Sequence, residues 1–280
     1  MNQTRPEQLV FFLGGHDLEM LTIRGLLEQH APGRFHDRGL GWGARASSYR
    51  GEILAALVAG ATPVLIELED DLGLPDGTLF IADHHGARAG KEAPTALHQV
   101  FRLLALPPEG WTRWFDLVAA NDRGYIPALR QIGASASEIA DIRTADRRAQ
   151  GITQADEDAA EQAVRHLELD AGGALTVVAL AHARTATVTD RLHPALGGPG
   201  YRNLLVLAPG EANFFGEGRI VAALATQFPT AWYGGALPDQ GFWGHQCDTA
   251  EQGNIRRIVA GLAATDWERS AGRLRPLAAL

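Results

Sequence analysis

The chain has 280 residues, of which 46% are hydrophobic and 21% charged, and its formal net charge is -8. The length allows one large domain or two, and the composition is ordinary for a soluble globular protein. No block of Lys and Arg offsets the negative charge, which argues against a protein that coats long nucleic acid and leaves room for a local basic pocket.

The first hydrophobic stretch, residues 9–13, is too short for a signal peptide or a membrane span, and no later stretch reaches the length needed. Cys247 is the only cysteine, which excludes an intrachain disulfide and suits a reducing compartment. We therefore expect a cytoplasmic protein that does not bind membranes.

Apolar runs alternate with segments of helical periodicity through the first half of the chain. The runs that read as strands are residues 9–13, 62–66 and 78–82, and those that read as helices are residues 20–30, 49–59, 94–104 and 111–120. This alternation predicts an α/β fold whose N-terminal domain has a mainly parallel sheet flanked by helices.

The second half begins after a strongly charged stretch of helical character, residues 135–166, which indicates a connector. Strands at 174–180 and 203–207 and a helix at 219–227 then predict a smaller C-terminal α/β domain. We expect boundaries that give an N-terminal domain at residues 1–133, a connector at 134–171 and a C-terminal domain at 172–280.

Acidic and His side chains follow the predicted strands of the first half and one of its helices. They are His16, Asp17 and Glu19, then Glu67 and Glu69, then Asp83, His84 and His85, and finally Asp122. In an open α/β sheet, ligands bind at the carboxyl ends of the strands. Carboxylates together with neutral imidazoles suit Mn²⁺, Fe²⁺ or Zn²⁺, so these residues are candidate metal ligands.

Each of these groups also has an ordinary structural interpretation. Asp17 is placed to cap the helix that follows it, and Asp83 to cap a turn beside two solvated histidines. Asp122, followed by Gly124, has the position of a residue that ends a helix.

The order of these motifs resembles the DHH phosphoesterase superfamily, which includes RecJ-type exonucleases, oligoribonucleases, cyclic-dinucleotide phosphodiesterases and manganese pyrophosphatases. The matching segments are His16-Asp17-Leu18-Glu19, the acid at Glu67 or Glu69, the intact Asp83-His84-His85, the lone acid Asp122, and the glycine-rich segment from Gly234 to His245. The resemblance implies a catalytic DHH domain followed by a smaller, substrate-binding DHHA1-like domain.

The resemblance also implies a set of site residues. One or two Mn²⁺ ions, with Mg²⁺, Fe²⁺ or Zn²⁺ as alternatives, would be held by His16, Asp17, Glu19, Glu67, Glu69, Asp83, His84 and Asp122. Asp83 would bridge two ions and His85 would polarise the substrate or protonate the leaving oxygen. The substrate would be bound by Arg184, Gly234, Gly235, Gly244 and His245, with Arg184 making a bidentate contact to phosphate.

The expected activity is metal-dependent hydrolysis of a small phosphoester, above all a short or cyclic nucleotide phosphodiester. Glu19 stands where the family has Asp, and the first motif is compressed, which favours the alternative of a catalytically weak nucleotide-binding or sensor protein. An unrelated metallohydrolase would need a His-x-His or His-Glu-x-x-His motif, and the sequence has neither. The expected partner is a small phosphorylated ligand or short nucleotide, and a homodimer is compatible with the sequence.

Overall fold

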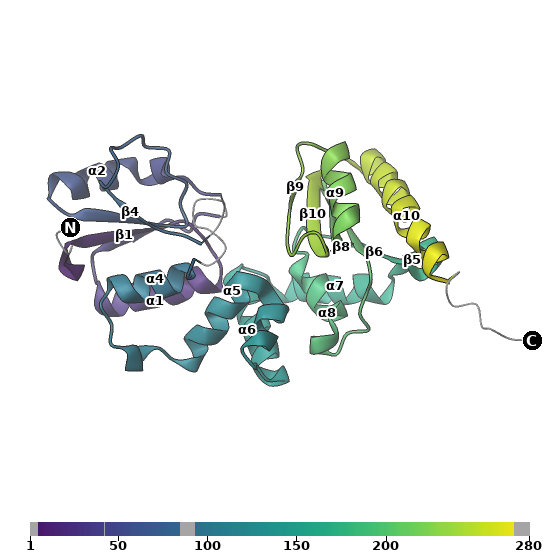
Figure 1. Cartoon of the computed structure of the whole chain (residues 1–280), viewed down its shortest axis with the longest axis horizontal. Helices are drawn as coiled ribbons and strands as arrows, with labels where there is room; N and C mark the ends of the chain where they lie inside the picture. The colour runs from purple at the N-terminus through teal and green to yellow at the C-terminus, as the bar shows by residue number, and fades with distance from the viewer. Residues whose placement is uncertain (1–4, 42, 85–92, 272–280) are drawn as a thin grey trace, which may run out of the picture. The chain divides into compact units, whose positions relative to one another are not determined.

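The structure, a computed structural model, describes residues 5–41, 43–84 and 93–271 (Figure 1). It divides into two compact units, Met1–Gly151 and Ile152–Leu280. The break falls inside the predicted connector, and the three-part division expected from the sequence stays a prediction. Within the ranges given, no helix combines the length and the apolar character needed to cross a membrane.

The first unit is built on a four-stranded parallel sheet, which confirms the fold class predicted for the N-terminal half. Its strands are β1 (Leu9–Leu13), β2 (Phe35–Asp37), β3 (Thr62–Ile66) and β4 (Phe80–Ala82), in the order β2-β1-β3-β4. β1 and β3 are nearly continuous apolar runs because helices cover both faces of a parallel sheet. β2 lies in a segment that the sequence did not identify as a strand.

Helices pack on both faces of this sheet. α1 (Leu18–His30), α2 (Arg50–Val58) and α4 (Ala96–Leu103) lie on these faces, and α5 (Arg113–Gln131) and α6 (Ala136–Ala149) pack against α1. On the α2 side, Tyr49 and Ile53 pack against Phe12 of β1 and Leu65 of β3. Figure 1 shows α1 and α4 on the opposite face. The sheet is therefore the middle layer of three, and the carboxyl ends of its parallel strands lie together at one edge.

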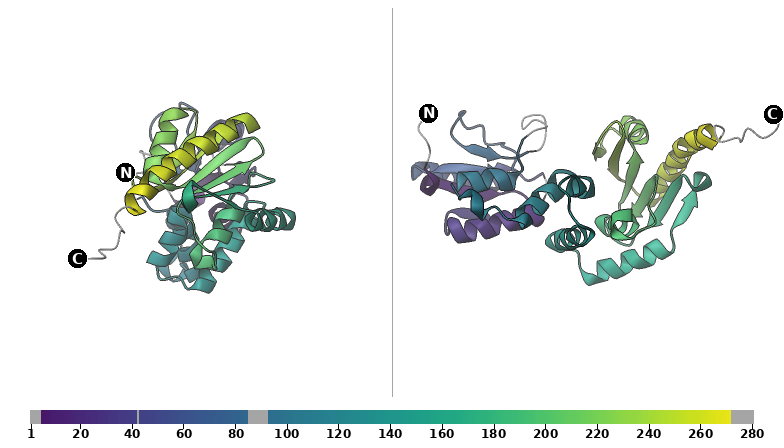
Figure 2. Two further views of the ribbon diagram at one scale, coloured as in Figure 1. Left: turned by 90° about the vertical axis from the view of Figure 1, so that its right-hand side faces the viewer. Right: turned by 60° about the horizontal axis from the view of Figure 1, so that its bottom comes forward.

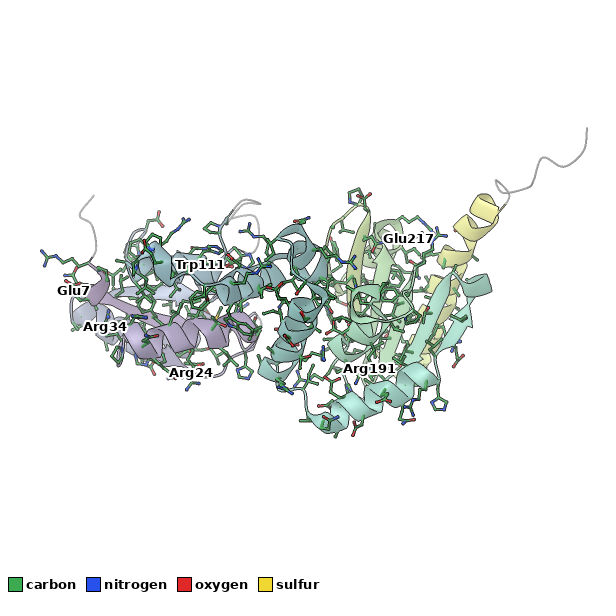
Figure 3. The ribbon with its side chains drawn as sticks, turned by 90° about the horizontal axis from the view of Figure 1, so that it is seen from below. Glu7, Arg24, Arg34, Trp111, Arg191 and Glu217 are labelled. Atoms are coloured by element: carbon green, nitrogen blue, oxygen red, sulfur yellow. The ribbon has the colours of Figure 1, made fainter. Side chains whose placement is uncertain are left out.

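An aromatic cluster joins α4 to the start of α5. The Trp111 ring, labelled in Figure 3, stacks on His98 with centroids 4.0 Å apart and meets Phe101 and Phe115 edge-on at 5.2 and 5.4 Å. Such aromatic pairs add stability beyond the area they bury. The cluster fixes α5 beside α4, and these two helices both reach the candidate site described below.

The sequence predicts that the helix before Asp122 ends near that residue, but α5 continues to Gln131 across a kink. Gly124 has φ -165° and Tyr125 has φ 61° and ψ -149°, so the helical path breaks between them. Pro127 then falls in the first turn of the second helical segment, where its missing N–H needs no partner within the helix. Asp122 therefore lies just before a break inside a longer helix.

The second unit is built on a six-stranded mixed sheet with the order β5-β6-β7-β8-β10-β9. The strands are β5 (Glu168–Asp170), β6 (Leu175–Ala179), β7 (Leu204–Ala208), β8 (Glu211–Glu217), β9 (Trp232–Gly234) and β10 (Gln240–Gln246). Among these described strands only the β6–β7 pair is parallel. With the first unit this confirms two α/β parts, the first with the parallel sheet.

Helices cover this sheet too, and Figure 2 shows them from two further sides. They are α7 (Gln154–Arg165), α8 (Ala186–Leu192), α9 (Gly218–Gln227) and α10 (Thr249–Ala271). One apolar core lies between the sheet and α9 and α10, and another between the sheet and α7 and α8. Arg191 of α8, labelled in Figure 3, donates to Glu157 Oε2 of α7 at 2.5 Å and ties that pair together.

Two segments of the second unit differ from the sequence-based expectation. Residues 211–217 form a strand after the turn at Gly210, whose φ is 79°. The glycine-rich run forms the end of β9, the turn that follows it, and β10, which pair as a hairpin. Aromatic rings cover its glycines, since a Cβ on Gly244 would lie 2.3 Å from the Trp232 indole. Packing across the hairpin therefore supports a strand with low intrinsic β-propensity.

Candidate metal site

Four potential ligands meet at the carboxyl edge of the parallel sheet. They are Glu19 at the start of α1, Glu67 after β3, His84 after β4 and Asp122 on α5, and one ligand atom of each lies within 4.8 Å of all the others. Parallel neighbours β1, β3 and β4 end at the same edge, which brings segments far apart in the sequence together. We call these four residues the carboxylate cluster.

The backbone around Glu67 explains why the loop after β1 begins with a glycine, Gly14. A Cβ on Gly14 would lie 2.2 Å from the Glu67 carbonyl oxygen, so a larger residue does not fit there. Glu67 itself has φ 50°, a left-handed conformation that is uncommon for a residue with a side chain. Such conformations persist where the surrounding structure fixes them, and they gather at functional sites.

Glu19 is the most deeply buried member of the cluster, with 1% of its surface exposed. Its Oε1 accepts a hydrogen bond from the Leu97 N–H at the start of α4 (3.0 Å). Its Oε2 is buried and has no hydrogen-bond partner among the described residues. Burial, followed by the negative charge of Asp122, raises the pKa of Glu19 to about 8. A cation bound at the cluster would satisfy this oxygen and offset the charge.

The other three members are largely buried and close together. His84 Nε2 lies 2.5 Å from Asp122 Oδ2 and 3.5 Å from Glu67 Oε1. Burial, with Asp122 and Glu19 as the next causes, raises the pKa of Glu67 to about 10. Burial lowers the pKa of His84, which favours the neutral imidazole that metals bind. Crowded carboxylates beside a neutral imidazole suit a divalent cation, so the donor set fits a metal ion.

Asp17 and Asp83 lie beside the cluster. Asp17 caps α1, with its Oδ1 accepting from the Met20 N–H at 2.9 Å. Both carboxylates add to the charge that raises the pKa of Glu67. The Asp83 carbonyl accepts from Gln99 Nε2 at 2.9 Å, and the same amide donates to the Pro94 carbonyl at 2.8 Å. Gln99 therefore fixes the backbone that leads from β4 to the cluster.

Two further candidates lie away from the cluster, and one lies outside the described residues. Glu69 is exposed and pairs with Arg45 at 3.1 Å, so of the two acids after β3 it is Glu67 that joins the cluster. His16 is exposed and is not a member of it. His85, the predicted proton donor, lies outside the described residues.

The predicted substrate-binding residues all belong to the second unit. Arg184 is exposed just before α8, and its N–H donates to His182 Nδ1 at 3.1 Å. Gly234 ends β9, Gly235 turns with φ 105°, and Gly244 lies on β10. The His245 ring, also on β10, lies 5.0 Å from Phe228, and its Nε2 is 3.6 Å from Glu251. Their role in substrate binding stays a prediction.

Sequence reasoning missed the buried polar residues that bond next to the cluster, above all Asn121, Arg143 and Asp146. A signal was present in α6, whose buried face contains Ile139, Ile142, Arg143, Asp146 and Ala149. Two charged residues on an otherwise apolar helical face are unusual, because charged side chains are rarely buried unless they are paired. The pattern predicts a buried ion pair, although it does not name the partners.

Solved structures similar to this chain include RecJ from Thermus thermophilus in complex with Mn²⁺, at 16% identity, TM-score 0.49, over 92% of this chain and 52% of that one. An exonuclease RecJ bound to manganese is 16% identical, with TM-score 0.48, over 91% of this chain and 90% of that one. An exopolyphosphatase-related protein from Bacteroides fragilis is 10% identical, with TM-score 0.43, over 92% and 93%. The chain thus spans about half the length of the Thermus RecJ.

No protein-family model matches the chain, and no curated protein matches it in sequence. All three structures are at most 16% identical to this chain and have TM-scores below 0.5, so no conclusion about this chain is drawn from them. The chemistry proposed below therefore rests on this chain's own residues.

Proposed function

We propose that this chain is a metal-dependent phosphoesterase of the DHH type that hydrolyses a small phosphoester, with a short or cyclic nucleotide phosphodiester as the favoured substrate class. The carboxylate cluster is the observation that carries the proposal. One ligand atom from each member lies within 4.8 Å of the others, and Glu19 Oε2 is buried without a hydrogen-bond partner among the described residues. That arrangement is costly for the metal-free protein and favourable once a cation binds.

Glu19, Glu67, His84 and Asp122 would hold the ion, and Asp17 and Asp83, whose negative charges act on Glu67, would contribute ligands to a second one. We favour Mn²⁺ because the donors are carboxylates with one imidazole. A bound divalent cation would supply positive charge for the phosphoryl oxygens and lower the pKa of water. Glu19 and Glu67 would release protons when the ion binds, since ligands must be deprotonated.

The substrate proposal follows from charge and size. A net charge of -8 opposes long nucleic acid, whereas a short phosphoester needs only a few cationic contacts. We propose Arg184 and His245, with the glycines Gly234, Gly235 and Gly244, as the residues that bind it. We also retain the proposal that His85 protonates the leaving oxygen, with Asp83 as a metal ligand.

One observation favours the alternative, a catalytically weak nucleotide-binding or sensor protein. The four ligands that meet within 4.8 Å are enough for one ion, and Glu69 and His16 lie outside them. Phosphoryl transfer with one ion lacks the two-sided stabilisation of attacking and leaving oxygens that two ions give. This alternative expects ligand and Mn²⁺ binding without turnover.

The test measures product release from pyrophosphate, dinucleotides, cyclic dinucleotides and a chromogenic phosphodiester, with Mn²⁺ and then with EDTA. Asp122→Asn keeps the side-chain shape and removes a proposed ligand charge, and Glu69→Gln is the matched control outside the cluster. We expect Mn²⁺-dependent release that Asp122→Asn abolishes and Glu69→Gln keeps. Mn²⁺ binding without release of any product would support the sensor alternative, and undiminished release in EDTA would refute a metal-dependent reaction.

A further inference from the structure

We infer that Arg143 is a positioning residue of the metal site, because it holds in place the two backbone segments that carry Asp122 and Glu19. The inference rests on the proposed metal site and adds a residue that lies outside the carboxylate cluster. Arg143 is on α6 and only 2% of its surface is exposed. A buried guanidinium is rare unless its charge is matched, so its partners define its role.

The first link runs from Arg143 to α5. Arg143 Nη1 donates to Asn121 Oδ1 at 2.8 Å, and Asn121 is itself buried. Asn121 directly precedes Asp122 on the same helix. Because adjacent residues share a peptide unit, fixing the Asn121 side chain also restricts the backbone from which the Asp122 carboxylate reaches the cluster.

The second link runs to the start of α1. Arg143 Nη1 also donates to Asp146 Oδ2 at 2.7 Å, and Asp146 Oδ1 accepts from the Leu18 N–H at 3.4 Å. Leu18 lies between Asp17 and Glu19. The same guanidinium therefore joins the residue before Asp122 to the residue before Glu19, although these are far apart in the sequence.

The third contact stabilises the kink of α5. The Arg143 Cζ lies 3.9 Å from the centroid of the Tyr125 ring, which is a close cation–π contact. Tyr125 has φ 61° and ψ -149°, a conformation that glycine adopts readily and a tyrosine does not. Since the kink begins two residues after Asp122, holding Tyr125 in place also sets the direction in which α5 leaves the cluster.

Helix packing alone does not explain this arrangement. Neighbouring positions on the same face of α6 are filled by Ile139 and Ile142, and a buried ion pair is often no more stabilising than well-packed apolar residues. A guanidinium, however, offers donors in a rigid plane and a face that stacks on an aromatic ring. Those properties match a residue that fixes geometry at three points at once.

The test compares Mn²⁺ affinity, measured by isothermal titration calorimetry on the full chain, between wild type and Arg143→Lys. Lysine keeps the charge, but its compact ammonium has no guanidinium plane to lie over the Tyr125 ring while a terminal nitrogen bonds Asn121 and Asp146. We expect affinity about 10- to 100-fold weaker, the size of loss seen when residues supporting metal ligands are changed. Arg143→Met should lose at least as much, and Arg143→Lys keeps the test open if the methionine variant does not fold.

Two controls separate positioning from general stability. Arg113→Lys alters the exposed pair of Arg113 with Glu138 (2.9 Å), which joins the same two helices away from the cluster. Ile139→Val loosens the apolar packing of α6 one turn from Arg143. Both variants should bind Mn²⁺ as the wild type does, and their thermal midpoints show how a loss of stability alone affects the measured affinity.

Wild-type affinity in Arg143→Lys would overturn the inference, and so would an equal loss in Arg113→Lys or Ile139→Val. The readout does not depend on turnover. A wild-type chain that binds Mn²⁺ but hydrolyses no phosphoester refutes the proposed function and leaves this comparison valid. A wild-type chain that binds no divalent ion would refute both the proposed function and the positioning role of Arg143.

Discussion

The burial of Glu19 leads to an unusual expectation, namely that Glu19→Gln stabilises the metal-free protein while it removes metal binding. In the folded chain the pKa of Glu19 is raised from 4.5 to about 8, chiefly by burial. At pH 7 the folded chain therefore holds a proton that the unfolded chain has released. At about 1.36 kcal/mol per pH unit between 4.5 and 7, this costs about 3 kcal/mol.

Because the pKa of Glu19 is raised in the folded chain, its contribution to the free energy of unfolding falls as pH rises. A carboxyl group with a raised pKa contributes its full stability below pH 4.5 and loses it progressively as pH rises to about 8. Glutamine does not titrate, and its carbonyl oxygen can still accept from the Leu97 N–H. The gain from Glu19→Gln should therefore approach about 3 kcal/mol at pH 7 and fall below about 1 kcal/mol at pH 5.

The assay is urea unfolding at both pH values, in EDTA and in saturating Mn²⁺. An ion present at about 100 times its dissociation constant adds about 2.7 kcal/mol to the stability of the folded wild type. Glu19→Gln should show no such gain, and Glu69→Gln, changed at an exposed residue outside the cluster, should behave as the wild type. A Glu19→Gln chain that is less stable than wild type in EDTA at pH 7, or equally stabilised by Mn²⁺, would refute the reasoning.

Two further predictions concern the same edge of the sheet. Gly14→Ala places a Cβ 2.2 Å from the Glu67 carbonyl oxygen, and we expect a loss of about 1–3 kcal/mol in unfolding free energy together with weaker Mn²⁺ binding. Gly25→Ala is the matched control at an exposed position of α1, where a Cβ meets nothing within 4 Å, and should stabilise the fold by about 0.5–1 kcal/mol. Mn²⁺ affinity should fall as pH is lowered from about 8, because Glu19 and Glu67, with pKa values raised to about 8 and about 10, must lose their protons. Calorimetry in buffers of different ionisation enthalpy measures the number of protons released. An Mn²⁺ affinity that does not change with pH would contradict this expectation.

The sequence was sufficient to predict which strand ends carry the candidate ligands, since each follows a clear apolar run. It could not choose between Glu67 and Glu69, because residues two apart in a strand point to the same face. The choice depends on the backbone. At Glu67 the chain turns into a left-handed conformation with φ 50°, which ends the alternation and sends Glu69 toward Arg45. No local pattern indicates that turn, since glutamate is not a residue that favours it.

The sequence did not predict the kink of α5, because contacts distant in the sequence determine the backbone there. Gly124 predicts the end of a helix, and by local propensity Pro127 three residues later favours the same end. The helix resumes because contacts from a different helix support the break, above all the Arg143 guanidinium over the Tyr125 ring. The hairpin of β9 and β10 shows the same principle, because Trp232 lies over Gly244 across the two strands. Tertiary packing overrode propensity in both places.

These features together determine how the carboxylate cluster relieves the repulsion between its negative charges. Carboxylates that repel one another in a buried site can relax by moving apart, by taking up protons or by binding a cation. The tight contact of Gly14 with Glu67, the hydrogen bonds of Gln99 and the buried network of Arg143 all oppose movement. Proton uptake is the response left to the metal-free chain, because burial and then the neighbouring carboxylates raise the pKa values of Glu19 and Glu67. A cation replaces those protons without moving the ligands, so the rigidity that makes the metal-free state costly also makes the site ready for a metal ion.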